Sequence, residues 1–288
     1  MTGAGVGFMF GVSQYTTQQW TFAQDIEAYG ALGVDCVEVC EYKLDAQRLD
    51  AQLGLIREAG LLISSVQPQV HTLYPDSLEA EPKEPQARAA LIRRAIERIG
   101  PFAPQGTPFV VNTGVAPDGN FREAHAVAER EFRALACFAA DQGMRLALEP
   151  LNAILMNTNS FVWLIPQVLD MIGRVDHPAF GLCMDTWNVW QDPKVLEHIA
   201  GCGDKIWVTH VSDWHLPRAF ADRTIIGQGE IPLPALLRAI RETGYTGAYS
   251  LEIFSDSSLP DSLWKADGRR VIQDSRAGLE RAWQEASL

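Results

Sequence analysis

The sequence is poor in basic residues and long apolar runs. Lys and Arg number 24 against 36 Asp and Glu, which gives a formal charge of −12 at pH 7. Nucleic-acid-binding domains usually carry a basic face, so this balance argues against a nucleic-acid partner. No apolar run approaches the roughly 18 residues that span a bilayer, and the amino terminus lacks a signal-peptide pattern. We therefore expect a cytoplasmic protein that contacts neither nucleic acid nor membrane.

Cysteine is also scarce, and its number is odd. The five cysteines lie mostly in apolar runs, which indicates buried free thiols in a reducing compartment: Cys36, Cys40, Cys137, Cys183 and Cys202. Cys36 and Cys40 are four residues apart across a predicted strand, a spacing that does not suit a zinc knuckle. We expect no disulfide framework and no thiolate zinc site.

Apolar runs alternate with helically spaced segments along the whole chain. The predicted strands are Val6–Val12, Val34–Val39, Leu61–Val66, Phe109–Asn112, Leu146–Leu148, Phe180–Met184, Ile206–Thr209 and Ala248–Leu251. The predicted helices are Trp20–Leu32, Leu44–Ala59, Gln86–Phe102, Asn120–Gln142, Ser160–Gly173 with Ser160 as N-cap, Pro193–Ala200, Leu233–Glu242 and Leu259–Gln284. A long loop, Gln67–Pro85, follows the third strand.

Eight such units in 288 residues predict α/β architecture, a single (β/α)8 TIM barrel that forms one domain over residues 1–288. The main rival is a doubly wound open sheet. That fold would carry a glycine-rich phosphate loop after the first strand, and Gly7 and Gly11 do not form one. A cluster of Lys, Arg and glycine amides for a phosphate group is also missing at the last two strands.

Four successive strands end at residues that can bind a metal. Glu149 follows Leu146–Leu148 and precedes Pro150, which ends the strand because proline has no N–H. Asp185, His210 and Glu252 close the next three strands in the same way. Active sites of these barrels lie at the carboxyl ends of the strands, so the four side chains should converge there. For one such residue, a polar strand end is the simpler interpretation, but four in succession favour a site.

Three carboxylates brought together would repel each other unless a cation lies between them. A set of two Glu, one Asp and one His suits one divalent ion. We expect Mn²⁺ or Mg²⁺, with Co²⁺ or Zn²⁺ as alternatives.

The sequence resembles the sugar isomerase/epimerase superfamily with a xylose-isomerase-like barrel, and most closely its ketose 3-epimerase branch, which includes tagatose 3-epimerase. The resemblance covers nearly the whole chain. The motifs on which it rests are Leu148-Glu149-Pro150-Leu151-Asn152, Asp185-Thr186-Trp187-Asn188, His210-Val211-Ser212-Asp213, Asp222-Arg223 with Gly227-Gln228-Gly229, and Ser250-Leu251-Glu252. It implies that Glu149, Asp185, His210 and Glu252 bind one divalent metal, and that the protein is a homodimer or tetramer.

The resemblance also implies a reaction. Glu149 and Glu252 would lie on opposite faces of a sugar or polyol substrate, one removing a proton beside a carbonyl and the other returning it. The metal would stabilise the enediolate as a Lewis acid. Arg223 would reach substrate oxygens with its fork of donors. Further substrate-facing candidates are Trp187 and His71, with Trp190 and Trp214 nearby, while Asp213 would orient His210 or Arg223.

The sequence departs from the family at Asn188, where members commonly carry histidine. Asn188 can still bind the substrate by donating a hydrogen bond to a sugar oxygen, but asparagine neither takes a proton nor binds a cation well. This departure keeps a second reaction open, in which proton removal is followed by loss of a leaving group. That reaction is carried out by dehydratases or lyases acting on keto-inositols, dehydroshikimate or oxidised glycosides.

Two further alternatives rest on the metal residues. The apurinic endonucleases of this superfamily hold three zinc ions, and His71 and Asp222 resemble two of their ligands. Asn112, Asn188 and Thr224 occupy positions where further histidines would be expected, and the chain has only six histidines. A catalytically silent sugar-binding barrel is disfavoured because all four metal residues are kept.

Overall fold

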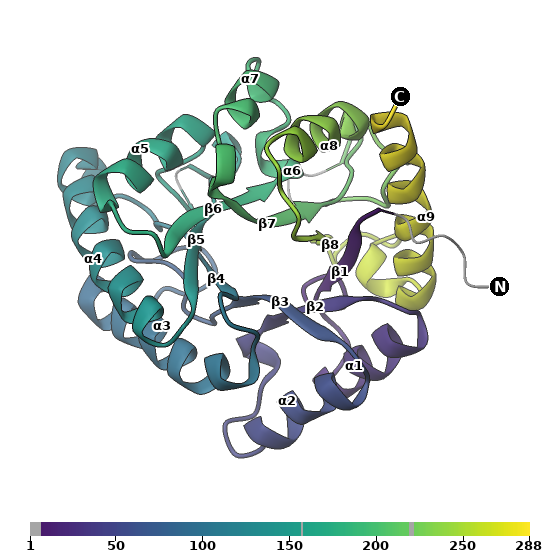
Figure 1. The fold of residues 1–288 in the computed structure, drawn as a ribbon, viewed down its shortest axis with the longest axis horizontal. Coiled ribbons are helices and arrows are strands. Elements are labelled where there is room, and N and C mark those ends of the chain that lie inside the picture. Colours follow the sequence, from purple (N-terminus) through teal and green to yellow (C-terminus); the bar gives the residue numbers. More distant parts are fainter. Residues whose placement is uncertain (1–6, 157, 219–221) are drawn as a thin grey trace.

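A computed structural model describes residues 7–156, 158–218 and 222–288. Eight parallel strands close into one barrel in the order of the sequence, with helices around it (Figure 1). The strands are β1 (Met9–Ser13), β2 (Cys36–Cys40), β3 (Leu62–Gln67), β4 (Pro108–Val111), β5 (Arg145–Leu148), β6 (Phe180–Asp185), β7 (Ile206–Val211) and β8 (Ala248–Leu251). The predicted TIM barrel is confirmed. Val6, where the first strand was expected to begin, lies outside the described residues.

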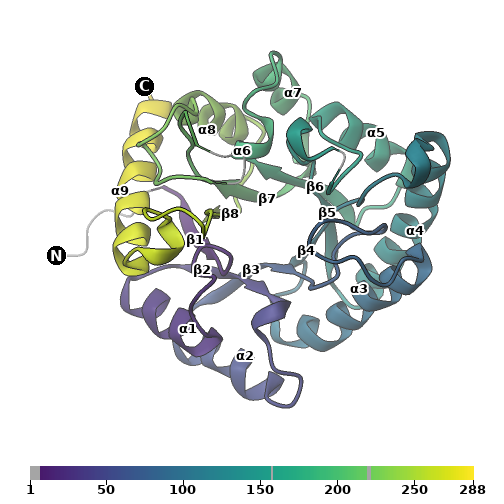
Figure 2. The same cartoon turned by 180° about the vertical axis from the view of Figure 1, so that it is seen from behind.

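The helices form an outer ring, which Figure 2 shows from behind. They are α1 (Phe22–Ala31), α2 (Leu49–Glu58), α3 (Pro85–Ile99), α4 (Phe121–Asp141), α5 (Ile165–Val175), α6 (Thr186–Val189), α7 (Val195–Ala200), α8 (Leu233–Glu242) and α9 (Gly268–Ala286). In the described part of the chain, no helix has the length and apolar character needed to cross a membrane.

Three predicted helix starts are wrong. The second helix begins at Leu49 rather than Leu44, because the backbone of Leu44 is extended. Ser160 does not cap α5, which begins at Ile165, because the Ser160 hydroxyl is buried and bonded to Val162 and Thr113. The last helix begins at Gly268 rather than Leu259, since the Asp267 side chain accepts from the N–H of Arg269 and caps it there. The short helix α6 was not predicted.

Alternate strand residues point into the barrel and set the height of the site. Val110, Ala147, Cys183 and Val208, from β4 to β7, form a small buried cluster of their own. Two residues further along a strand the side chain returns to the same face. That step leads to Asn112, Glu149, Asp185 and His210. The site therefore forms the next inward-facing layer, directly above this cluster.

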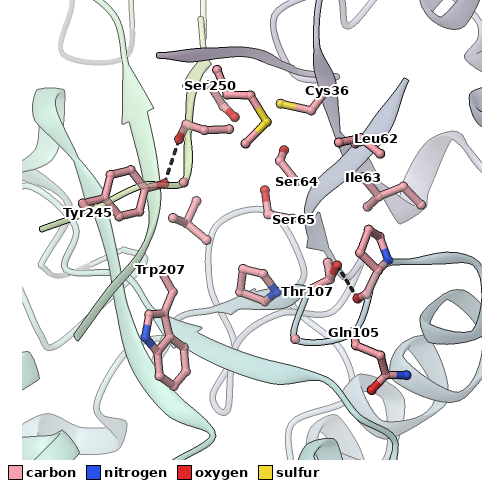
Figure 3. Close-up of a pocket in the computed structure, with 17 residues that line it drawn as sticks. Cys36, Leu62, Ile63, Ser64, Ser65, Gln105, Thr107, Trp207, Tyr245 and Ser250 are labelled. Carbon is pink, nitrogen blue, oxygen red and sulfur yellow. Dashed lines mark hydrogen bonds between the residues drawn. The ribbon is translucent and has the colours of Figure 1, made fainter. Parts of the chain in front are cut away.

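A cavity of about 250 Å³ lies at the other end of the barrel (Figure 3). Its described lining includes the first residues of five strands, Met9, Cys36, Leu62, Pro108 and Ala248, and no Asp, Glu, His, Lys or Arg. Burial raises the pKa of Cys36 in this lining to about 12, and Tyr245 donates to the Ala248 carbonyl. Neither group ionises near neutral pH, so the described lining of this cavity holds no side chain suited to acid–base chemistry.

Candidate metal centre

Four side chains from neighbouring strands meet at the carboxyl end of the barrel: Glu149, Asp185, His210 and Glu252. One ligand atom of each lies within 4.8 Å of the others, and all four residues are buried. His210 Nδ1 is 3.6 Å from Glu149 Oε1 and 3.5 Å from Glu252 Oε2. Atoms bound to one divalent ion at about 2.0–2.3 Å are themselves about 3–4.5 Å apart. The donor set therefore fits a single divalent cation.

The backbone aims these side chains inward. Asp185 ends β6 and caps α6, because its Oδ1 accepts from the N–H of Trp187 at 2.9 Å. Glu149 and Glu252 come one residue after their strands, yet their N–H groups still donate to the carbonyls of Val111 and Val211. The hydrogen-bond ladder of the sheet thus continues through both glutamates and fixes the direction in which their side chains point.

Arg223 joins two of the four groups. Its Nη2 lies 2.7 Å from Asp185 Oδ2, and its Nη1 lies 3.0 Å from Glu252 Oε2. The guanidinium carbon lies over the rings of Trp187 and Phe254, at 4.9 and 5.1 Å from their centroids. A bidentate, ring-stacked arginine is held rigidly. Arg223 therefore offsets part of the negative charge and fixes the orientation of both carboxylates.

Asn188 joins two of the four groups from the other side. Its Nδ2 is 3.0 Å from both Glu149 Oε1 and Asp185 Oδ2, and its Oδ1 accepts from the N–H of Asn152 at 2.9 Å. Both of its amide hydrogens are thus directed at predicted metal ligands.

Burial and charge shift the protonation of the site. Burial raises the pKa of Glu252 to about 8, although His210 and Arg223 oppose the shift. Burial likewise raises the pKa of Asp185. Burial alone would lower the pKa of His210, but its contacts with Cys183, Glu252 and Glu38 outweigh this and raise it well above its usual value. Near neutral pH the cluster can therefore hold a proton.

Glu38 belongs to this site and was missed from the sequence. It lies in β2, is fully buried, and its Oε2 is 2.8 Å from His210 Nε2. Gln67, at the end of β3, donates to Glu252 Oε1 at 3.1 Å and to Glu38 Oε1 at 3.4 Å. The available signal was a single carboxylate inside an apolar strand, Cys36–Cys40, where an unpaired charge is costly.

A cavity of about 360 Å³ opens above the four groups. His71, Trp187, Asn188 and Arg223, all predicted to face a substrate, line it together with Glu149 and Glu252. The loop between β3 and α3 adds Asp76, Ser77 and Leu78 to the wall. His71 Nε2 lies 3.9 Å from Asp76 Oδ2, so these two residues face each other in that loop.

Asp213 does not have the contacts expected of it. In its described hydrogen bonds, the Asp213 carboxylate contacts neither His210 nor Arg223. It accepts from the backbone N–H groups of Trp214, Gly227, Gly229 and Ile231. A Cβ at Gly229 would lie 2.3 Å from Asp213 Oδ1, so glycine is required for this approach. Asp213 therefore shapes the loop that follows Arg223.

Trp190, Trp214 and Asp222 lie apart from the centre. Trp190 and Trp214 pack against each other, with ring centroids 6.2 Å apart, while Trp187 alone of the three lines the cavity. Asp222 accepts from Ser255 and pairs with Arg218. In the described residues, the groups able to hold a metal include neither His71 nor Asp222, which gives no support to a three-zinc centre.

Comparison with known proteins agrees with the barrel fold. A family model described as xylose isomerase-like TIM barrel matches residues 26–281. A 3-dehydroshikimate dehydratase of Pseudomonas putida is 29% identical over 273 residues, which cover 88% of this chain and 39% of that protein. This chain therefore spans well under half the length of that relative. An L-ribulose-5-phosphate 3-epimerase of Salmonella typhi is 26% identical, with 87% and 89% covered.

Among solved structures, the IolI protein with a bound zinc atom is 18% identical and superposes with a TM-score of 0.79, covering 97% of this chain and 99% of that one. At this identity the likeness concerns the fold.

Proposed function

The chain belongs to the xylose isomerase-like TIM barrel family, and we propose that it is a divalent-metal-dependent sugar epimerase or isomerase. The observation that carries the proposal is the convergence of Glu149, Asp185, His210 and Glu252 beneath one cavity. Two of these residues are glutamates from different sides of the barrel, which suits removal of a proton by one and its return by the other.

The donor set supports Mn²⁺ as the preferred ion, with Mg²⁺, Co²⁺ and Zn²⁺ as alternatives, because three of its four groups are carboxylates. The zinc atom bound by the IolI protein, which shares this fold, supports the binding of a divalent ion by this chain. When bound, the ion would supply Lewis-acid stabilisation of negative charge on a substrate oxygen.

The protein's own groups move the proton. Glu252 lies at the cavity floor, where its carboxylate can remove a proton from a bound substrate or return one to it. Glu149 also lies at the cavity floor, where Asn188 orients its Oε1. Arg223 keeps the Glu252 carboxylate in one orientation, so that proton transfer is directed at one position in the cavity.

The cavity favours a substrate without phosphate or carboxylate. Of the charged residues that line it, Asp76, Glu149 and Glu252 are acidic, and Arg223 already pairs with Asp185 and Glu252. Apart from the proposed metal ion, the described lining holds no Lys or Arg free to pair with an anionic group, so desolvating an anionic substrate next to these carboxylates is costly. Leu78, Leu151 and Leu155 add an apolar wall. A neutral sugar or polyol fits this lining best.

A dehydratase or lyase acting on a keto-sugar, keto-inositol or oxidised glycoside is the second candidate. It shares the first step, removal of a proton beside a carbonyl. Asn188 in place of the family histidine supports it, as does the similarity to 3-dehydroshikimate dehydratases.

The test is proton exchange in D₂O. The Mn²⁺-loaded protein is incubated with a panel of free ketoses, and the substrate α-proton is followed by NMR. The proposal predicts deuterium incorporation with inversion or isomerisation, and loss of at least 10³-fold in rate for E252Q and E149Q. Glu230, which is exposed, provides the control variant E230Q.

Elimination without exchange into recovered substrate would favour the lyase, with 3-dehydroshikimate and a keto-inositol as probes. Full turnover by E252Q would overturn both candidates, because both need the same base.

A further inference from the structure

Glu38 is a buried carboxylate outside the set of four metal-facing groups. It has no exposed surface, and the donors that reach it include His210 Nε2 at 2.8 Å, Ser65 Oγ at 2.7 Å and Gln67 Nε2 at 3.4 Å. Burying a carboxylate is costly unless its hydrogen bonds are satisfied. A charge kept at this cost in the middle of β2 calls for a role in the site.

The hydrogen bond to Glu38 decides how His210 faces the other groups. A carboxylate only accepts, so the hydrogen lies on Nε2 and points away from the centre. Nδ1 then faces Glu149 Oε1 and Glu252 Oε2, at 3.6 and 3.5 Å. In the neutral ring this nitrogen carries the lone pair, which is the form that binds a metal.

Gln67 extends the same network to Glu252. Its amide nitrogen has two hydrogens and lies within donor distance of both Glu252 Oε1 and Glu38 Oε1. Glu38 therefore reaches two of the four predicted ligands: His210 on β7 by a direct contact, and Glu252 just after β8 through Gln67.

We propose that Glu38 is a positioning residue that holds His210 with Nδ1 toward the metal and, through Gln67, orients Glu252. This rests on the proposed function, since it presumes a divalent ion at the four groups. Loss of such a partner of a ligating histidine commonly lowers metal affinity by about 10–100-fold.

The experiment compares E38Q and E38A with the full-length wild type. Gln keeps the shape and an acceptor for Nε2–H but removes the charge, whereas Ala removes both. Mn²⁺ alone is titrated calorimetrically into each metal-free protein, after circular dichroism has shown that each is folded. We expect affinity to fall about 10-fold in E38Q and about 100-fold in E38A.

The matched control is Asp25, another buried carboxylate, whose partners Lys43, Thr17 and Gln14 lie apart from the four groups. D25N should keep the wild-type Mn²⁺ affinity within about twofold. A second readout is ¹⁵N NMR of His210 in the Zn²⁺-loaded protein, which reports which ring nitrogen carries hydrogen. The wild type should show Nε2–H with a slowly exchanging proton, and E38A a fast-exchanging one.

The outcomes separate this inference from the proposed function. Wild-type Mn²⁺ affinity and an unchanged His210 spectrum in folded E38Q and E38A would overturn the role of Glu38 and leave the metal centre standing. A wild-type protein that binds none of Mn²⁺, Co²⁺ and Zn²⁺ would overturn both.

Discussion

The side-chain amide of Asn188 donates to Glu149, with Nδ2 3.0 Å from Oε1. The same nitrogen donates to Asp185, while the amide oxygen accepts from the backbone of Asn152. One histidine nitrogen carries at most one hydrogen, so histidine could not donate to both carboxylates from a single atom. The departure from the family at this position therefore creates a bridge between two predicted metal ligands.

We expect N188A to lower Mn²⁺ affinity about 10-fold, because both carboxylates lose the donor that orients them. Calorimetric titration of the metal-free variant measures this. N120A is the control, since Asn120 caps α4 at an exposed position; it should cost about 1 kcal/mol of stability and leave the affinity unchanged. Wild-type affinity in N188A would instead confine Asn188 to substrate contact or packing.

The fold and the four central residues could be predicted because they depend on local sequence. Strands buried on both faces appear as short apolar runs, and a side chain at the carboxyl tip of each must face the same rim. Pro150 marks one such tip directly. This rule alone predicts that four side chains meet at the rim: Glu149, Asp185, His210 and Glu252.

The remaining parts depend on contacts between distant segments. Glu38 precedes the end of β2 by two residues, so the strand-end rule does not find it, and its partner His210 is 172 residues away. Asp213 follows a metal residue closely, yet its side chain turns to the backbone of the next loop. Serine commonly caps helices, but the Ser160 hydroxyl is hydrogen-bonded to Thr113 on another loop.

Removing the charge of Arg223 should destabilise the metal-free protein more than the loaded one. Arg223 is the cation between Asp185 and Glu252, and breaking a buried pair of this kind costs about 3–5 kcal/mol. We expect that loss for R223M in urea unfolding without metal, and a smaller loss for R223K, which keeps the charge.

Excess Mn²⁺ should recover part of the stability of R223M, because a second cation then lies between the same carboxylates. The measurement is the free energy of unfolding with and without Mn²⁺. Equal losses in both conditions would show that Arg223 acts mainly by packing between its aromatic neighbours.

Asp25 should make stability depend on pH. Its carboxylate accepts from Thr17, Gln14 and Lys43, yet burial raises its pKa from 3.8 to about 6 in the folded protein. Because this pKa is raised on folding, the protonated Asp25 carboxyl stabilises the folded protein. This stabilisation is fully present below about pH 3.8 and is lost as pH rises through 6.

The wild type should therefore lose up to about 3 kcal/mol relative to D25N between pH 4 and 6.5. Urea unfolding of both proteins across this range measures the difference. The control is D50N, at an exposed position of α2, whose free energy of unfolding should depend on pH in the same way as that of the wild type. Parallel profiles for D25N and the wild type would show that Asp25 keeps its ordinary pKa.

Arg88 on α3 should control substrate affinity without touching the cavity. The residue is fully buried, and its donors go to the loop between β3 and α3. Nε donates to the Thr72 carbonyl at 2.8 Å and Nη1 to the carbonyls of Glu79 and Pro82, while Nη2 donates to the Thr72 hydroxyl. The same loop supplies His71, Asp76, Ser77 and Leu78 to the cavity wall.

We expect R88M to raise KM about 10-fold, equal to about 1.4 kcal/mol, because the loop wall is no longer held in place. Turnover and Mn²⁺ affinity should change little, since the four metal-facing groups lie on or directly after strands and not on this loop. R94M, at an exposed site of the same helix, is the control. Hydrogen exchange of residues 72–82 should accelerate in R88M and not in R94M. Unchanged exchange together with an unchanged KM would show that the bonds to neighbouring loops, such as Ser77 N–H to the Thr158 carbonyl, hold this wall without Arg88.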